Sequence, residues 1–407
     1  MRLGQGEIYP LHGVIQHYSW GGYSYIPGLL QRPNHEGRPW AEYWLGAHPN
    51  HPSSYKANGE FSLAEAIASA PEAILGSSIA SKFGELPYLF KVLDVRQMLS
   101  IQVHPDKASA SKKFDDENMR GIPVHAPHRN YKDRNHKPEM MIALSEFWLL
   151  HGFKTEALLS ETLSFTPELT FLKKTFANSD YKSLYELVMN MDQSEVNRIL
   201  EPLAQRVTPA YKNDTIPKAH PDFWAARAVE TFCKNDHYDR GIFSIYFFNL
   251  VHLKKGEGVF QPEGLPHAYL EGQNVELMAN SDNVLRAGLT DKHIDVKELL
   301  EHLQFVAIEP RILEATDHEV WTFDTPAEEF RLTQYQLAPD KKVDLQSSSV
   351  EILLVVEGEV EISTGRQALV LTQGEAALIT RDTTTNLRAT ARSLAFLAGS
   401  GLKALVY

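Results

Sequence analysis

The sequence has one cysteine in 407 residues, no long apolar run and no excess of basic residues. Cys233 alone cannot form an intrachain disulfide or a structural zinc site built from cysteines. No apolar segment approaches the ~20 residues needed to span a bilayer, and the N-terminal segment MRLGQGEIYPLHG lacks the apolar core of a signal peptide. We therefore expect a protein of the reducing cytoplasm without a membrane partner.

The net charge of the chain bears on whether a nucleic acid could be a partner. The formal net charge is -12, whereas a broad nucleic-acid-binding surface needs a basic patch, so we expect no nucleic-acid partner. A small anionic substrate stays compatible with this charge, because a local cluster of lysine and arginine can act inside an acidic protein. The length predicts about two to four domains.

Short apolar runs bounded by turn residues predict β-strands over much of the chain. Residues 86–93 (LPYLFKVL), 98–104 (MLSIQVH) and 242–252 (IFSIYFFNLVH) have this pattern. After residue 311 short strands alternate with turns, as in 350–356, 360–362, 368–371 and 376–379. Such spacing is typical of a small antiparallel sandwich or jelly roll.

Residues 155–232 interrupt this β pattern with helical periodicity. Apolar residues recur three or four positions apart at Leu184, Leu187, Val188 and Met191, and again at Val196, Ile199 and Leu200. Residues 222–232 (DFWAARAVETF) predict a helix that Asp222 could cap. The block is therefore expected to be a helical insertion into or beside a β domain.

Three polar segments interrupt apolar surroundings and are candidates for chemistry. Gln102 and His104 would lie on one face of a strand, where they fit either a metal or a hydrogen-bonded pair at a sheet edge. Glu139 ends a charged stretch and precedes an apolar run, so it could enter a cavity or belong to a solvated loop. His267 follows the turn Gly264-Leu265-Pro266 and could be a ligand or structural. Spacing alone leaves these alternatives open.

Five stretches resemble the type I mannose-6-phosphate isomerase family. They are YSWG (18–21), AEYWLGAHP (41–49), SIQVHPDK (100–107), YKDRNHKPE (131–139) and HAYLEGQNVELMANSDNVLRAGLTDK (267–292). The matches are long, ordered and spread over most of residues 1–295. The last hundred residues match only by their general β character.

The resemblance implies a mainly β fold with three parts. A cupin-type jelly-roll catalytic domain would comprise residues 1–154 and 233–310, with an α-helical domain at 155–232 and a C-terminal β-sandwich or jelly-roll domain at 311–407. It also implies one zinc ion per chain, bound by Gln102, His104, Glu139 and His267. Such nitrogen and oxygen donors leave an open position, as catalytic zinc requires, and they would also suit manganese, iron or cobalt.

The resemblance further places charged and polar residues in the site. Catalytic candidates are Lys137, Glu276, Asp282, Arg286 and Lys292, and substrate-binding candidates are Trp20, Lys91, Ser100 and Tyr269. The family usually reads Thr-Pro-Lys where this chain has Thr290-Asp291-Lys292, which makes the role of Lys292 less secure.

The implied reaction interconverts mannose 6-phosphate and fructose 6-phosphate. Asp282 and Lys292 are candidates for ring opening, while Glu276, Lys137 or zinc-bound water could move the proton between C2 and C1 through a cis-enediol(ate). Zinc and Arg286 would stabilise the developing charge. Ser100, Lys91 and Arg286 are candidates for the phosphate.

Two tryptophans and His136 each allow two interpretations. Trp20 and Trp44 could form a wall for the sugar or belong to the core. His136 could orient a ligand or cap its loop.

Two other functions compete with this assignment. A non-catalytic cupin-like protein could bind a sugar phosphate, because the scaffold alone does not set function. An isomerase of a related sugar phosphate would carry the same machinery. A bifunctional nucleotide-transferring enzyme is disfavoured, because the three predicted parts occupy the whole chain. The sequence does not indicate an oligomeric state, and a monomer is compatible with it.

Overall fold

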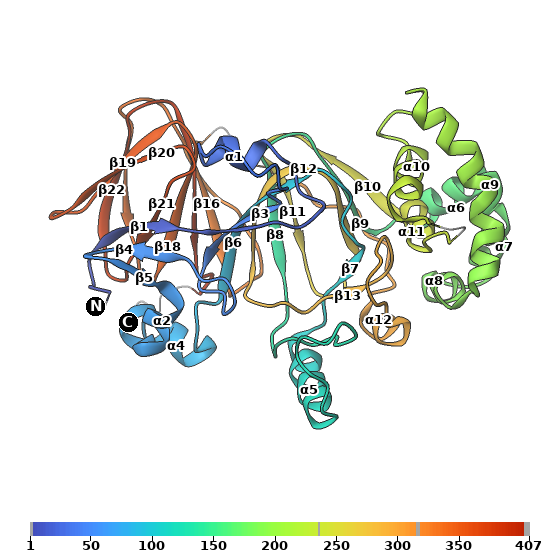
Figure 1. Cartoon of the computed structure of the whole chain (residues 1–407), viewed down its shortest axis with the longest axis horizontal. Coiled ribbons are helices and arrows are strands. Elements are labelled where there is room, and N and C mark those ends of the chain that lie inside the picture. Colours follow the sequence, from blue (N-terminus) through green and yellow to red (C-terminus); the bar gives the residue numbers. More distant parts are fainter. Residues whose placement is uncertain (1–2, 235–236, 315–317, 403–407) are drawn as a thin grey trace.

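A computed structural model describes residues 3–234, 237–314 and 318–402 of the chain. Two β regions lie side by side, and a group of helices adjoins one of them at the far end of the molecule (Figure 1). The helices in the described ranges are too short or too polar to span a bilayer.

The central β region is built around one long strand. Its strands are β2 (Val14–Gln16), β3 (Glu42–Gly46), β6 (Tyr88–Val95), β7 (Gln102–Val103), β8 (Glu139–Ala143), β9 (Phe147–Phe153), β10 (Phe248–Leu253), β11 (Glu257–Gln261), β12 (His267–Ala279), β13 (Leu285–Arg286) and β14 (Leu313–Glu314). The main order is β14-β11-β8-β12-β6-β3-β2. β7 and β9 also pair with β12, and they carry β13 and β10 on their other sides.

β12 changes partners along its length, which lets it join two parts of this region. Its first half pairs with β9, with a register shift between Tyr269 and Glu271, and its second half pairs with β6 and β8. Gly272 lies at the change with φ +132, where a Cβ atom would lie 2.6 Å from the backbone oxygen of Glu146. Only glycine accommodates this backbone and this close approach.

The second β region consists of two facing sheets and includes the N-terminal strand. Its strands are β1 (Ile8–His12), β4 (Ser54–Lys56), β5 (Glu60–Ser62), β15 (Val320–Thr322), β16 (Arg331–Leu337), β17 (Lys342–Gln346), β18 (Glu351–Glu357), β19 (Glu359–Ser363), β20 (Ala368–Thr372), β21 (Ala376–Ile379), β22 (Thr384–Ala389) and β23 (Ser393–Gly399). One sheet has the order β15-β16-β23-β18-β21-β1-β4-β5, and the other has the order β17-β22-β19-β20. Buried residues of both sheets, such as Leu353 and Ile362, share one core, as in a sandwich.

The N-terminal residues thus pair with strands from the C-terminal part of the sequence. Ile8 pairs with Ile379 in the antiparallel β1–β21 ladder. Residues 1–154 were predicted to belong to the catalytic domain, but three of their strands, β1, β4 and β5, are part of a sheet of the C-terminal β region. The exact domain boundaries stay a prediction.

Most helices gather beyond β9 and β10 at one end of the molecule (Figure 1). The helices are α1 (Tyr25–Leu29), α2 (Leu63–Ser69), α3 (Pro71–Leu75), α4 (Ser77–Phe83), α5 (Lys107–Met119), α6 (Glu156–Phe165), the 3-10 helix η1 (Pro167–Leu169), α7 (Thr170–Ala177), α8 (Tyr181–Asn190), α9 (Gln193–Lys212), α10 (Pro221–Phe232), α11 (Gly241–Phe247) and α12 (Val296–His302). Leu184, Val188 and Leu200 pack in one core with Phe153 and Leu285. The helices are therefore attached to the central sheet by a shared apolar core.

Three local predictions differ from the structure. Residues 242–252 were predicted as a strand, but α11 precedes β10, and every residue of α11 is buried. A run that is apolar on all sides lacks the periodicity that separates helix from strand. In 98–104 only β7 is a strand. His220, not Asp222, caps α10, because Pro221 takes the first helical position.

Candidate active site and metal centre

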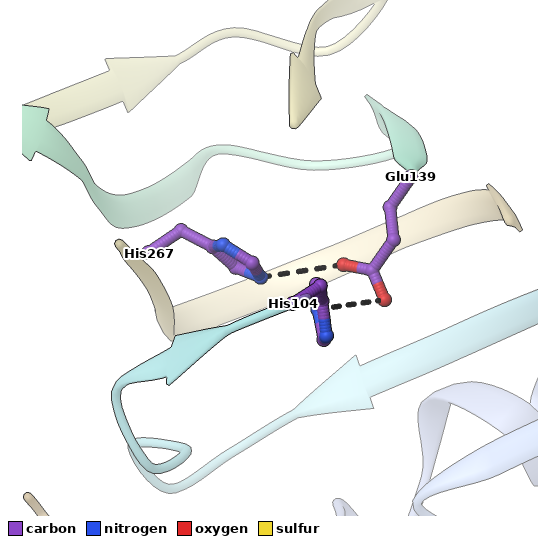
Figure 2. A group of neighbouring side chains, drawn as sticks. All are labelled: His104, Glu139 and His267. Carbon is purple, nitrogen blue, oxygen red and sulfur yellow. Dashed lines mark ion pairs between the residues drawn. The ribbon is translucent and has the colours of Figure 1, made fainter. Parts of the chain in front are cut away.

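Two histidines and a glutamate converge at one end of the central sheet (Figure 2). His104 directly follows β7, Glu139 begins β8 and His267 begins β12. His104 Nε2 lies 3.5 Å from Glu139 Oε1, and His267 Nε2 lies 3.3 Å from Glu139 Oε2. The ligand atoms of these buried side chains all lie within 4.8 Å of one another. This spacing lets the three groups share one metal ion.

The other ring nitrogen of each histidine is held by a backbone carbonyl. His104 Nδ1 donates to the oxygen of Asn283 at 2.8 Å, and His267 Nδ1 donates to that of Leu265 at 2.9 Å. These bonds leave each Nε2 as the lone-pair nitrogen. His104 Nε2 is buried without a hydrogen-bond partner in the described part of the chain, and burial lowers the pKa of His104 to about 4. A neutral imidazole with a buried, unpaired nitrogen fits a metal ligand.

Gln102 lies next to the same cluster. It pairs with His267 between β7 and β12, and with Arg286 between β7 and β13. It lines a cavity of about 60 Å³ together with Glu139 and His267. Amide and carboxylate oxygens and imidazole nitrogens are donors that zinc accepts. The four residues predicted to bind zinc therefore lie together.

Two buried lysines lie among three buried carboxylates in this site. Lys137 Nζ is 3.0 Å from Glu139 Oε1, while Lys91 Nζ is 3.4 Å from Glu42 Oε2 and 3.3 Å from Glu276 Oε2. Burial alone would lower the pKa of Lys91, but Glu42 and Glu276 raise it above its usual value. Burial would raise the pKa of Glu139, but Lys137 and the histidines hold it well below its usual range. A divalent cation beside Glu139 would offset the excess negative charge.

Glu276 is held by a second contact on the same strand. The Tyr269 hydroxyl donates to Glu276 Oε1 at 2.8 Å, and Gln261 Nε2 donates to the Tyr269 oxygen at 3.3 Å. Burial raises the pKa of Glu276 and that of Tyr269. Glu276 also pairs in register with Lys91 on β6. A carboxyl group with a raised pKa beside a lysine is suited to accept and return a proton.

A cleft of about 610 Å³ adjoins this cluster. Among the predicted site residues, the cleft is lined by Trp20, Lys91, Ser100, Gln102, Lys137, Asp282, Arg286 and Lys292. Trp44 also lines it. Glu139, His267, Tyr269 and Glu276 line the smaller cavity, which shares Lys91, Gln102 and Lys137 with the cleft. His104 lies against Glu139, so the structure brings every predicted site residue into one place.

Two cations, Arg286 on β13 and Lys292 in the loop after it, face the cleft. Burial lowers the pKa of Arg286, and burial together with the Arg286 charge lowers the pKa of Lys292. The negative charge of Asp291 acts to raise the pKa of Lys292. Two crowded cations with lowered pKa values favour an anion between them.

Asp239 anchors this loop, and sequence reasoning did not find it. Its Oδ1 accepts the backbone N–H groups of Gly241 at 2.7 Å and Leu289 at 2.8 Å, and its Oδ2 accepts that of Thr290 at 3.1 Å. Leu289 has φ +54, a conformation that a leucine adopts only when its surroundings impose it. The DRG sequence at 239–241 carries no spacing signal that would have indicated this contact.

Asp133 organises the other side of the site and was also missed as an individual residue. It accepts from the Ser281 hydroxyl at 2.8 Å, the Asp282 backbone N–H at 2.7 Å and Asn283 Nδ2 at 3.1 Å. Asn283 in turn holds His104 through its carbonyl. The stretches 131–139 and 267–292 therefore interlock, which explains why both are dense in polar residues.

His136 does not contact a predicted metal ligand. Its Nδ1 contacts Glu263, and its Nε2 lies 2.7 Å from Oε1 of Glu329. Burial alone would lower the pKa of His136, but these two carboxylates raise it to about 9. The residue joins the loop before Glu139 to the C-terminal β region.

Comparisons with known proteins agree with this geometry. Residues 8–156 match the family model of the phosphomannose isomerase type I catalytic domain. The mannose-6-phosphate isomerase of Escherichia coli is 37% identical over 376 residues, which cover 90% of this chain and 93% of that protein. The chain belongs to the type I mannose-6-phosphate isomerase family. The human member is 34% identical over 392 residues, covering 88% of this chain and 89% of that protein.

Solved structures of the family share the whole architecture. The crystal structure of mannose 6-phosphate isomerase from Salmonella typhimurium bound to fructose 6-phosphate and zinc has a TM-score of 0.86 and 35% identity. The alignment covers 97% of this chain and 99% of that one. The mainly β fold with a cupin-type region, a helical part and a C-terminal β part is therefore confirmed.

Proposed function

We propose that this protein interconverts mannose 6-phosphate and fructose 6-phosphate at a zinc ion bound by Gln102, His104, Glu139 and His267. The observation that carries the proposal is the buried cluster of His104, Glu139 and His267, which adjoins a cleft lined by Lys91, Lys137 and Arg286. The activity and zinc content of its family members support it. When bound, zinc supplies a Lewis acid that stabilises negative charge developing on a substrate oxygen.

Arg286 on β13 and Ser100 would bind the phosphate. A sugar phosphate carries close to two negative charges at neutral pH, and both residues line the cleft. Lys91 was also a candidate for this role, but its contacts with Glu42 and Glu276 favour a place beside the reacting carbons. Binding the phosphate away from the metal would orient C1 and C2 at the inner end.

Ring opening is the first chemical step. It breaks the bond between C1 and the ring oxygen, takes a proton from the anomeric hydroxyl and delivers one to the ring oxygen. Asp282 would be the base and Lys292 the donor. Burial acts to raise the pKa of Asp282, but His48, Lys137 and Lys91 hold it below its usual value, which keeps the carboxylate ionised and able to accept a proton.

The second step moves a proton from C2 to C1 through a cis-enediol(ate). Glu276 is our first candidate, since its raised pKa and its contact with Lys91 suit a group that takes and returns a proton. Lys137 is the second candidate, because it lies between Glu139 and the cleft. Trp20 and Trp44, which line the same cleft, would cover the sugar.

The test is a coupled assay of mannose 6-phosphate conversion with metal analysis before and after chelation. We expect about one zinc per chain, loss of activity with chelator and recovery with zinc. His267→Ala should lower activity by at least about 100-fold. His252→Ala is the matched control, because its ring stacks on Trp148 with centroids 4.2 Å apart and does not line the cleft.

The same assay separates the alternatives. A folded, zinc-loaded protein that binds mannose 6-phosphate without turnover would be a non-catalytic sugar-phosphate binder. Faster turnover of another aldose phosphate would reassign the substrate. The single cysteine and the acidic charge agree with the cytoplasm, where sugar phosphates are found, and we propose that location.

A further inference from the structure

His48 contacts the predicted ring-opening base from beneath the cleft. It follows β3, is only 4% exposed, and its Nε2 lies 3.3 Å from Asp282 Oδ2. The backbone N–H of Asn50 donates to His48 Nδ1 at 3.3 Å. Because Nδ1 accepts this bond, the ring proton of the neutral imidazole is on Nε2, where it is donated to Asp282.

The ring of His48 and the backbone of Asp282 are held by their surroundings, while the Asp282 side chain is 43% exposed. The His48 ring packs edge-on against Trp44, with centroids 4.8 Å apart, while the Asp282 backbone N–H is bonded to Asp133 at 2.7 Å. Asp282 and Trp44 line the cleft, whereas His48 is not among the described residues that line it. His48 therefore contacts two residues that line the cleft, Trp44 through ring packing and Asp282 through a hydrogen bond.

We propose that His48 is a positioning residue that orients the Asp282 carboxylate for ring opening. The inference rests on the proposed isomerase function. The His48 bond occupies Oδ2 and leaves Oδ1 to take the proton of the anomeric hydroxyl while the bond between C1 and the ring oxygen breaks. The ring oxygen takes its proton from a separate donor, so the proton count balances.

The charges around the pair favour an ionised Asp282. Among the described residues, the ionisable groups that face the two side chains, besides each other, are Tyr18, His51, Glu85, Lys91, Lys132, Asp133 and Lys137. Lys91 and Lys137 act with His48 to lower the pKa of Asp282, against the effect of burial. A base must be ionised to accept a proton, so loss of the His48 bond should raise the pH needed for activity.

Two substitutions at His48 separate the hydrogen bond from packing. His48→Gln retains an amide donor near the position of Nε2, whereas His48→Leu removes the donor and keeps an apolar ring-sized group. His51→Leu is the control, since His51 stacks on His48 in the same turn but is exposed. Zinc content, thermal stability and the pH profile of kcat/KM with mannose 6-phosphate are measured for all three.

In His48→Leu we expect kcat to fall by about 10-fold or more with KM changed less than about threefold, and the acid limb to rise by about one pH unit. The Gln variant should retain most of the activity, and His51→Leu should match the wild type. If His48→Leu does not fold, His48→Gln still tests the idea, because a folded, zinc-loaded Gln variant with a large loss of kcat overturns it.

A coupling test completes the experiment. If His48 acts through Asp282, His48→Leu combined with Asp282→Asn should be no slower than Asp282→Asn alone. Multiplicative losses would overturn the inference. A wild-type protein that does not turn over mannose 6-phosphate would instead refute the proposed function, so the two failures are distinguishable.

Discussion

Replacing Asp239 should loosen the loop that connects Arg286 on β13 to Lys292. Asp239→Ala removes the acceptor of three backbone N–H groups, from Gly241, Leu289 and Thr290, in a place where Asp239 is 7% exposed. A buried donor without a partner costs about 1–3 kcal/mol. Because the carboxylate is costly to bury and water can enter after its removal, we expect a net loss of about 3–5 kcal/mol in the free energy of unfolding.

Asp239→Asn provides the graded comparison. The amide oxygen can still accept from Gly241 and Leu289, while its NH₂ group replaces the acceptor for Thr290. The expected loss is therefore only about 1–2 kcal/mol. Denaturant unfolding followed by circular dichroism measures both values. Equal midpoints for the Ala variant and the wild type would refute the reasoning.

The kinetic readout separates loop positioning from general destabilisation. If the loop positions Arg286 for the phosphate and Lys292 for ring opening, Asp239→Ala should both raise KM for mannose 6-phosphate and lower kcat. Asp180→Ala is the control, because Asp180 caps α8 through the Ser183 N–H at 2.8 Å and lies outside the cleft. That variant should lose a little stability, with KM and kcat unchanged.

Three further predictions concern stability, pH and the buried charges. Gly272→Ala should unfold at a much lower denaturant concentration, since its Cβ would lie 2.6 Å from a backbone oxygen; a wild-type midpoint would contradict this close approach. Folding raises the pKa of His136 from about 6.5 to about 9. The protonated side chain therefore contributes its full stabilisation of the fold below pH 6.5, and this contribution is lost as the pH rises through about 9. The stability difference from His136→Phe should therefore shrink by about 2 kcal/mol between pH 6 and pH 10, whereas a constant difference would exclude the ion pairs. Glu42→Gln should lower the pKa of Lys91 and reduce kcat at high pH, as pH–rate profiles would show.

Much of the site could be predicted from the sequence because its residues lie in long stretches with a recognisable order. Gln102, His104, Glu139 and His267 come from three stretches, and the resemblance placed them together before the structure did. Spacing alone left each one with a structural alternative. Their common location depends on β12 pairing with β7, β8 and β9, a tertiary fact that no local pattern contains.

The missed residues show what local patterns lack. His48 contacts Asp282, more than 200 positions along the chain. Asp239 accepts from Leu289 and Thr290, about 50 positions away. α11 was predicted as a strand because burial on all sides removes the polar positions that reveal periodicity. The strands and turns of the C-terminal sandwich were easier to predict from the sequence, since alternating short strands and glycines are local features.

The pairing of β1 with β21 has a consequence for synthesis on the ribosome. β1 can pair early with β4, but the backbone N–H of Gly6 is bonded to the oxygen of Arg381 at 3.2 Å, so β1 meets its other neighbour, β21, only when nearly the whole chain has been made. At about 5–20 residues per second, that wait lasts roughly 20–70 s. During this time the edge of β1 that faces away from β4 is unpaired, and chaperones or a neighbouring nascent chain could bind it. A nascent chain stalled before residue 376 should therefore stay protease-sensitive at its N-terminus, although the central strands are already complete.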